Sequence, residues 1–256
     1  YRLFDEASYG LQLPTPQLDA EQSLDDAVAT IGWFLLGSSQ RLAEQYRHNG
    51  HWRLLVDWLD CLVELRALLS SLGQAAPRAS TSELRQVLDA LLEDWRPRVQ
   101  AGQQDDTARQ EAPAQFAAEL EQTRWGLFSL NTSRWLLART WTSARNKRGD
   151  RQGAAALQSW LPTFFAEEGR DLQLKRYQQQ PEDLAEQLPR LERLLLWLHL
   201  ARGTLDIAET DRLFGELNKL AELAKRPLSP EELEARMTQA QIIMSLKPWK
   251  TLLKNG

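Results

Sequence analysis

Residues 52–72, with the sequence WRLLVDWLDCLVELRALLSSL, constrain the fold more than any other stretch of the chain. Apolar side chains recur there at alternating intervals of 3 and 4, which is the period of one face of an α-helix. Further leucines and valines make most of the circumference apolar, so we expect this helix in the middle of a helical bundle. The positions on the regular face are Leu55, Trp58, Leu62, Leu65, Leu69 and Leu72.

A second apolar helix is predicted over residues 182–202, where leucines from Leu188 to Leu198 repeat the same spacing. Pro189 lies inside this range, which leaves a start near Leu188 as the other possible boundary. No segment shows the alternation of apolar and polar residues that is typical of a half-buried strand. Long stretches also lack both Gly and Pro, so the sequence predicts an all-α fold.

Polar and proline-containing stretches divide the chain into three parts. Residues 1–18 contain two prolines and no helical period, which predicts an extended leader. The polar stretch 100–111 predicts a boundary between a first helical bundle, 19–110, and a second, 111–256. Because each bundle has one long apolar helix, we expect two packed antiparallel bundles related by an approximate internal twofold.

Capping and breaking residues predict the ends of the other helices. Asp19 is expected to begin the first helix, and one of residues 80–82 the third, which Pro97 should end or kink. The pair Ser229-Pro230 is a strong signal for a helix start. The remaining predictions are helices over 113–128, 135–144, 150–167 and 207–225, an interruption at 131–133 and a basic tail over 246–256.

The tryptophan content indicates a large core, and the single cysteine indicates a reducing compartment. The chain has ten tryptophans, and the nine that precede Trp249 are interpreted as core side chains, with stacking on carbohydrate or bases as the alternative. Cys61 is the only cysteine, lies among core positions, and is interpreted as a buried, non-catalytic thiol. Because no apolar run reaches about 18 residues and no signal leader is evident, the expected location is the cytoplasm.

The net charge of −4 argues against general nucleic-acid binding, although positive charge is unevenly distributed. Residues 134–151 contain six basic side chains and one acidic one, and such a stripe can attract a polyanion through its local field. The sequence has no glycine-rich phosphate loop, nucleophile elbow or zinc-protease motif, and no residues complete a metal site beside the three histidines. We therefore expect no catalytic residue, metal or cofactor in this chain.

Arginines near the two apolar helices are the remaining candidates for a binding site. A guanidinium presents a planar fork of donors that matches phosphate oxygens, and several from different helices would form an anion groove. The alternative is that they are surface charges paired with Glu64, Glu83, Glu186 and Glu192. The candidates are Arg66, Arg78, Arg85, Arg190 and Arg193, together with Arg134 and Arg139 from the basic run.

The segment LRALLSSLGQAAPRASTSELRQVLDAL resembles the region of the conserved-histidine α-helical domain (CHAD) family that joins its first motif helix to the next helix. The later segment EDLAEQLPRLERLLLWLHLARG is similar to the corresponding helix of the family's second half. The likeness covers most of residues 20–225 and is greatest to CHAD regions that follow the CYTH β-tunnel of bacterial inorganic triphosphatases. It implies two helical bundles related by a twofold, with inorganic polyphosphate bound by basic side chains at their junction.

Two of the candidate arginines occupy positions of the family motifs. Aligned on Arg66, which keeps the last arginine of the first motif, Val56 stands where the family has a histidine. In the second motif Arg190 keeps a basic position, and Pro189 replaces the histidine.

The resemblance implies a non-catalytic CHAD-like domain that binds inorganic polyphosphate or another polyanion weakly, or that scaffolds an N-terminal CYTH catalytic domain. The parent protein would be an inorganic triphosphatase whose activity lies in the CYTH domain, and the segment from Tyr1 would be the linker that follows it. The alternative is a protein-interaction scaffold without an anion site. Membranes and specific nucleic-acid sequences are not expected among the partners.

Overall fold

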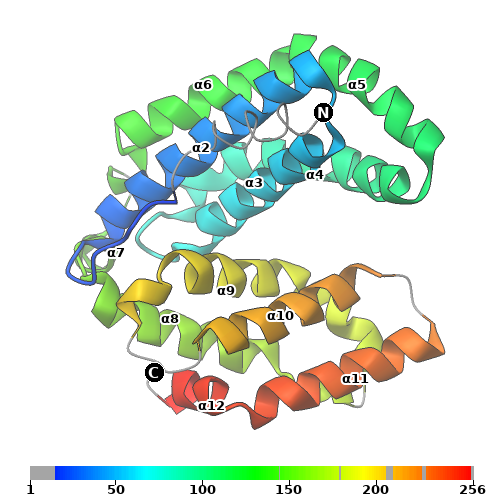
Figure 1. Ribbon diagram of the computed structural model, residues 1–256. Coiled ribbons are helices and arrows are strands. Elements are labelled where there is room, and N and C mark those ends of the chain that lie inside the picture. The colour runs from blue at the N-terminus through cyan, green and yellow to red at the C-terminus, as the bar shows by residue number, and fades with distance from the viewer. Residues whose placement is uncertain (1–14, 144, 179, 206–209, 227–228, 255–256) are drawn as a thin grey trace. The chain divides into compact units, whose positions relative to one another are not determined.

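The computed structural model describes residues 15–143, 145–178, 180–205, 210–226 and 229–254 (Figure 1). Over these ranges the protein is all-α, as predicted, and the sole β-contact is an isolated antiparallel bridge between Ser23 and Ala156. In this described part of the chain, no helix combines the length and the apolar character needed to cross a membrane.

The chain forms two compact units. Val28–Gly153 makes up the first unit, whereas the second combines Gln17–Ala27 with the chain from Ala154 onward. The predicted boundary stretch, 100–111, lies instead within the first unit, where it is mostly helical. The predicted twofold between two bundles stays a prediction, and most of the predicted leader, 1–18, lies outside the described residues.

Six α-helices and one 3-10 turn carry the described part of the first unit. The predicted central helix is confirmed, because α3 covers all but the last residue of 52–72. In order they are α2 (Leu24–Asn49), α3 (Trp52–Ser71), α4 (Arg78–Gln104), α5 (Asp106–Glu121), α6 (Thr123–Leu137), η1 (Thr140–Thr142) and α7 (Lys147–Gly153).

An aromatic cluster fills the core of the first unit. The ring of Trp58 on α3 meets Trp95, Phe116 and Trp125 edge to face at centroid distances of 5.8, 4.9 and 5.6 Å. Tyr46 of α2 joins the cluster through Phe116 at 5.0 Å. These side chains come from α2, α3, α4, α5 and α6, so one cluster ties five helices together and confirms the core interpretation of these tryptophans. Trp33, by contrast, is 43% exposed.

Several predicted helix ends are wrong. Asp19 closes a turn, whereas Ser23 caps α2 by accepting a hydrogen bond from the backbone N–H of Asp26 at 3.1 Å. Helix α4 begins at Arg78 and runs through Pro97 without ending there. The predicted helix 113–128 is split at Gln122, and the predicted interruption at 131–133 lies inside α6.

The described part of the second unit carries five α-helices, with three 3-10 segments between α8 and α10. A start near Leu188, the alternative boundary, is confirmed, because a 3-10 segment precedes it. In order the elements are α8 (Leu157–Leu172), η2 (Arg176–Gln178), η3 (Pro181–Gln187), α9 (Leu188–Leu200), η4 (Arg202–Thr204), α10 (Thr210–Lys225), α11 (Pro230–Ser245) and α12 (Lys247–Lys254).

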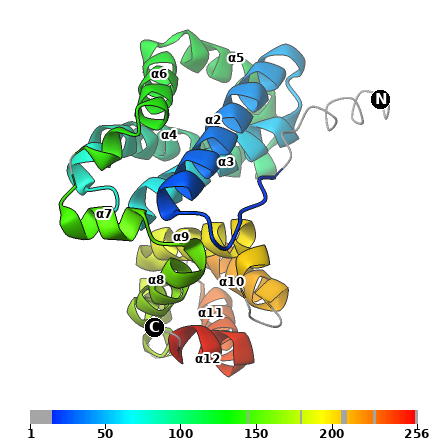
Figure 2. The ribbon, with the colours of Figure 1, turned by 90° about the vertical axis from the view of Figure 1, so that its left-hand side faces the viewer.

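Leucines dominate the core of the second unit, where α9 packs against α8 and α10, and α11 against α10. The predicted start of α11 is confirmed, since Ser229 Oγ accepts from the backbone N–H of Glu232 at 3.2 Å. Residues 247–254 of the predicted basic tail form α12, which packs beside α8 (Figure 2). Of the predicted helix 207–225, residues 207–209 lie outside the described residues.

Candidate anion-binding site

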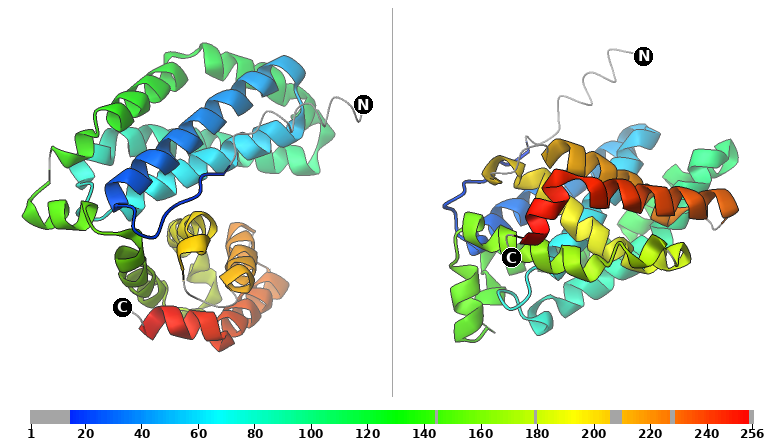
Figure 3. Two further views of the ribbon diagram at one scale, coloured as in Figure 1. Left: turned by 60° about the vertical axis from the view of Figure 1, so that its left-hand side comes forward. Right: turned by 90° about the horizontal axis from the view of Figure 1, so that it is seen from below.

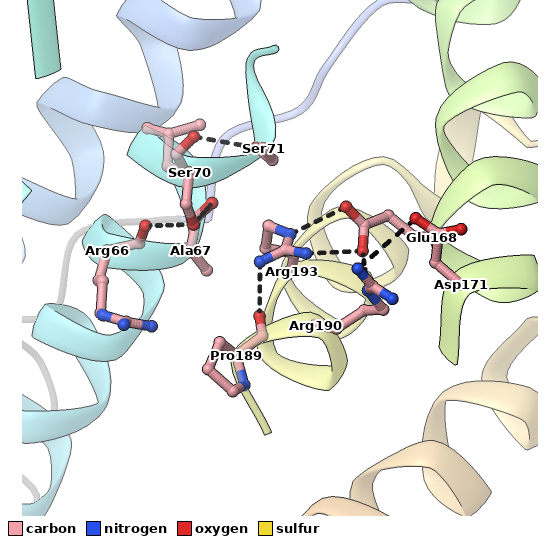
Figure 4. Close-up of polar contacts among 10 residues, drawn as sticks. Arg66, Ala67, Ser70, Ser71, Glu168, Asp171, Pro189, Arg190 and Arg193 are labelled. Atoms are coloured by element: carbon pink, nitrogen blue, oxygen red, sulfur yellow. Dashed lines mark hydrogen bonds and ion pairs between the residues drawn. The ribbon is translucent and has the colours of Figure 1, made fainter. Parts of the chain in front are cut away.

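Two of the seven predicted arginines come together in the second unit. Arg190 and Arg193 lie three residues apart on α9, so they project from one face of the helix. Both guanidiniums point to Glu168 of α8 (Figure 4). Arg193 donates from Nε to Glu168 Oε1 at 3.0 Å and from Nη2 to Oε2 at 2.8 Å, a bidentate pair. We call Arg190, Arg193, Glu168 and Asp171 the α9 arginine cluster.

Arg190 is held less completely than Arg193. Its Nε lies 3.1 Å from Glu168 Oε2 and its Nη2 lies 3.5 Å from Asp171 Oδ2. The Nε is buried, yet its N–H forms no hydrogen bond within the described part of the chain. Asp171 is 66% exposed, so water weakens its attraction for Arg190. The cluster is therefore neutral in formal charge but has a buried donor that is not satisfied.

The surroundings of the cluster strengthen the attraction between its charged side chains. The side chains of Arg193 and Glu168 are only 15% and 16% exposed, and partial burial reduces screening by water and salt. Arg193 Nη1 also donates to the carbonyl of Pro189 at 3.3 Å. This third hydrogen bond fixes the guanidinium plane of Arg193, which favours recognition of a planar or tetrahedral anion.

The candidate arginines of the first unit are dispersed over α3, α4 and α6 and the residues after α6. Arg66 of α3 forms an ion pair with Asp89 of α4, and its carbonyl accepts from Ser70 Oγ at 2.8 Å (Figure 4). Arg78 is exposed at the start of α4, and Arg85 is half-buried further along the same helix.

The basic run is likewise not a single patch. Arg134 is exposed on α6, and Arg139 follows that helix in the left-handed conformation with φ 46°. Arg145 has a side chain only 8% exposed, paired with Asp150 at 2.8 Å. Part of the run therefore holds α7 in place.

Three of the candidate arginines pair with acids that are not among those predicted. Asp89 pairs with Arg66, and Glu168 and Asp171 pair with the arginines of α9. Sequence reasoning missed these three acids because each belongs to a different helix from its partner. One signal was present: Glu168 and Asp171 have the same spacing of three residues as Arg190 and Arg193.

Two ionisable groups on α3 have raised pKa values. Burial, reinforced by Asp60, raises the pKa of Glu64 to about 7. Burial also raises the pKa of the Cys61 thiol well above its usual range, and the nearby negative charge of Glu64 adds to this effect. A thiol with a raised pKa is a poor nucleophile.

Within the described ranges, no three side chains of His, Cys, Asp or Glu gather closely enough to hold a metal ion. The chain matches no protein-family model and no curated protein.

Proposed function

We propose that this chain is a non-catalytic, CHAD-like helical domain that binds inorganic polyphosphate weakly through the α9 arginine cluster. The observation that carries the proposal is the approach of two guanidiniums to one oxygen, Glu168 Oε2, at 3.1 and 2.8 Å. Guanidinium forks recognise carboxylate and phosphate oxygens by the same geometry. Glu168 thus occupies the place that a phosphate group would take, and Arg190 Nε has a donor left to offer.

Internal competition accounts for the weakness of the proposed binding. A polyphosphate segment must displace the carboxylate of Glu168 or share the arginines with it, and both acids of the cluster repel it. Contacts of this kind weaken as salt rises, because counterions screen both partners. The proposal includes a cytoplasmic location, two bundles related by a twofold, and a CYTH domain as the partner that hydrolyses triphosphate.

Calorimetric titration of long-chain polyphosphate at about 50 and 200 mM salt tests the proposal. We expect saturable binding that falls with salt, and its loss in the double variant Arg190→Glu, Arg193→Glu. The variant Glu168→Gln removes the competing charge and should raise affinity about tenfold.

The matched control is Lys219→Glu with Lys225→Glu on α10, which makes the same change in net charge. An equal loss of affinity in this control would mean that binding follows overall charge and not the cluster. An unchanged or lower affinity in Glu168→Gln would also count against the proposed site.

A scaffold for protein interaction is the second candidate, and one observation favours it. Leu127, Leu130 and Leu137 of α6 are 51%, 65% and 81% exposed and lie on one side of the helix. Exposed apolar rows of this kind mark contact surfaces between proteins. The triple substitution to Ser should abolish co-elution with a separately prepared CYTH domain and leave polyphosphate affinity unchanged.

A further inference from the structure

A pocket of about 590 Å³ lies in the second unit, apart from the α9 arginine cluster. It is bounded by the end of α8, the turn that follows, and the helices α11 and α12, which are connected directly in the chain (Figure 3). All of its lining residues belong to this unit. Pockets of roughly 300–1,000 Å³ are typical of sites for small organic molecules.

The inner wall of the pocket is apolar. Leu174, Met244, Trp249 and Leu253 line it, and Trp249 is only 3% exposed. Gly169 brings α8 and α12 close together, because a methyl group there would lie 2.9 Å from Leu253 Cδ2 and 3.1 Å from Trp249 Cη2. The wall can therefore accept an aliphatic or aromatic body and exclude water from it.

The rim of the pocket is basic. Arg170, Lys175, Arg176 and Lys250 line it, and none of the described lining residues is acidic. Arg176 is committed to Asp183. The other three are exposed and form no ion pair with described residues, although Lys250 Nζ donates to the carbonyl of Ser245 at 3.1 Å and Arg170 Nε to that of Ala166 at 3.0 Å.

A ligand that fits an apolar wall beneath a cationic rim has an apolar body and an anionic group. We propose that this pocket binds a small amphipathic anion, with an aliphatic or aromatic body against Trp249 and Met244 and a single carboxylate or comparable anionic group at the rim. Polyphosphate has no apolar body, so this site does not rest on the function proposed above. The apolar wall supplies affinity, and the cations orient the ligand.

Fluorescence titration with 8-anilinonaphthalene-1-sulfonate, an aromatic anion, tests the site on the full chain. We expect one saturable site from which decanoate displaces the probe. Decanol and inorganic phosphate should displace it at least about tenfold less well, because each supplies only half of the match.

Variants assign the binding to this pocket. Lys175→Glu with Lys250→Glu should weaken probe affinity about tenfold, and Met244→Trp should weaken it similarly by filling the pocket. The control, Lys219→Glu with Lys225→Glu, should leave affinity unchanged. The proposal is overturned if the rim variant matches that control, or if phosphate or decanol competes as well as decanoate. Should Met244→Trp fail to fold, the comparison of the two charge variants decides the question.

Discussion

A buried carboxylate in the first unit and a buried guanidinium in the second are held by different kinds of partner. The first unit encloses the carboxylate of Glu119, 5% exposed, which accepts hydrogen bonds from the guanidinium of Arg124. The second unit encloses the guanidinium of Arg236, 0% exposed, whose recorded hydrogen bonds all go to backbone carbonyls. A side-chain partner can be deleted together with the charge that it neutralises, whereas a carbonyl cannot. The stability of the second unit should therefore depend more strictly on Arg236 than that of the first unit depends on Glu119.

Helix geometry explains the position of Arg236. Its Nη2 donates at 2.9 Å to the carbonyls of Leu223 and Arg226, at the C-terminal end of α10. The last carbonyls of a helix lack partners within the helix and carry partial negative charge. The guanidinium of Arg236 gives these carbonyls hydrogen-bond donors and a positive charge, although desolvation by burial lowers its pKa.

Removing the buried guanidinium should have the largest effect. Arg236→Met leaves the carbonyls of Leu223, Arg226 and Pro181 without these donors, which we expect to lower the free energy of unfolding by about 3–5 kcal/mol. Urea unfolding followed by circular dichroism measures the loss. The matched control is Arg226→Met, whose guanidinium is 58% exposed and should cost less than about 1 kcal/mol. Similar losses of unfolding free energy in both variants would show that the second unit depends on Arg236 no more than on an exposed arginine.

Disrupting the pair in the first unit should cost less and be reversible. Arg124→Met leaves the carboxylate of Glu119 buried without its cation, at an expected cost of about 2–3 kcal/mol. Adding Glu119→Met should recover at least half of this loss, because no buried charge then remains unpaired and Asp94, the other partner of Arg124, is 47% exposed. A double-mutant cycle in urea measures the coupling. No recovery in the double variant would show that the two units do not differ in this respect.

The half-buried carboxyl of Glu64 predicts a smaller, pH-dependent effect in the first unit. Because its pKa is about 7 in the folded chain against an ordinary 4.5, the folded state binds this proton more tightly. The free energy of unfolding should therefore fall as pH rises from about 4.5 to about 7.

Glu64→Gln removes that dependence. Relative to the unsubstituted chain, the variant should gain about 1–2 kcal/mol between pH 5 and pH 8, after allowance for partial exposure. Unfolding measured at both pH values tests this, with exposed Glu83→Gln as the control. If the variant instead lost stability relative to the unsubstituted chain between pH 5 and pH 8, the raised pKa of Glu64 would be contradicted.

The smallest expected effect concerns an unsatisfied hydroxyl in the aromatic core. Tyr46 Oη is buried without a hydrogen-bond partner among the described residues, and burial raises its pKa to about 12. Tyr46→Phe should leave the free energy of unfolding unchanged or raise it by less than about 1 kcal/mol, since no hydrogen bond is lost. A clear decrease on thermal unfolding would indicate that this hydroxyl does have a partner.

Local signals predicted the fold where they were strong. The apolar period of 52–72 gave α3 almost to the residue, and Ser229-Pro230 marked the start of α11. Predictions failed where local signals misled, as at the expected interruption over 131–133, which lies inside α6. Packing against neighbouring helices overrides weak breakers, so such residues do not define ends on their own.

The candidate site was predictable only in part. The sequence singles out Arg190 and Arg193, because both lie on a recognisable apolar helix. It does not reveal that Glu168 already holds them, since that contact joins two helices whose pairing depends on tertiary structure. The carboxylate between the arginines decides whether they serve as a binding site, and a list of basic residues carries no information about it.

The route of the chain between the units has a consequence for synthesis. The backbone N–H of Leu24 donates to the carbonyl of Ala155, and that of Leu157 donates to the carbonyl of Gln22, so the start of α2 is anchored to a segment made much later. On the ribosome, residues 17–27 must wait for the second unit to emerge before these bonds can close. Separating the chain after Gly153 would therefore yield two fragments, of which the later one lacks its own first segment.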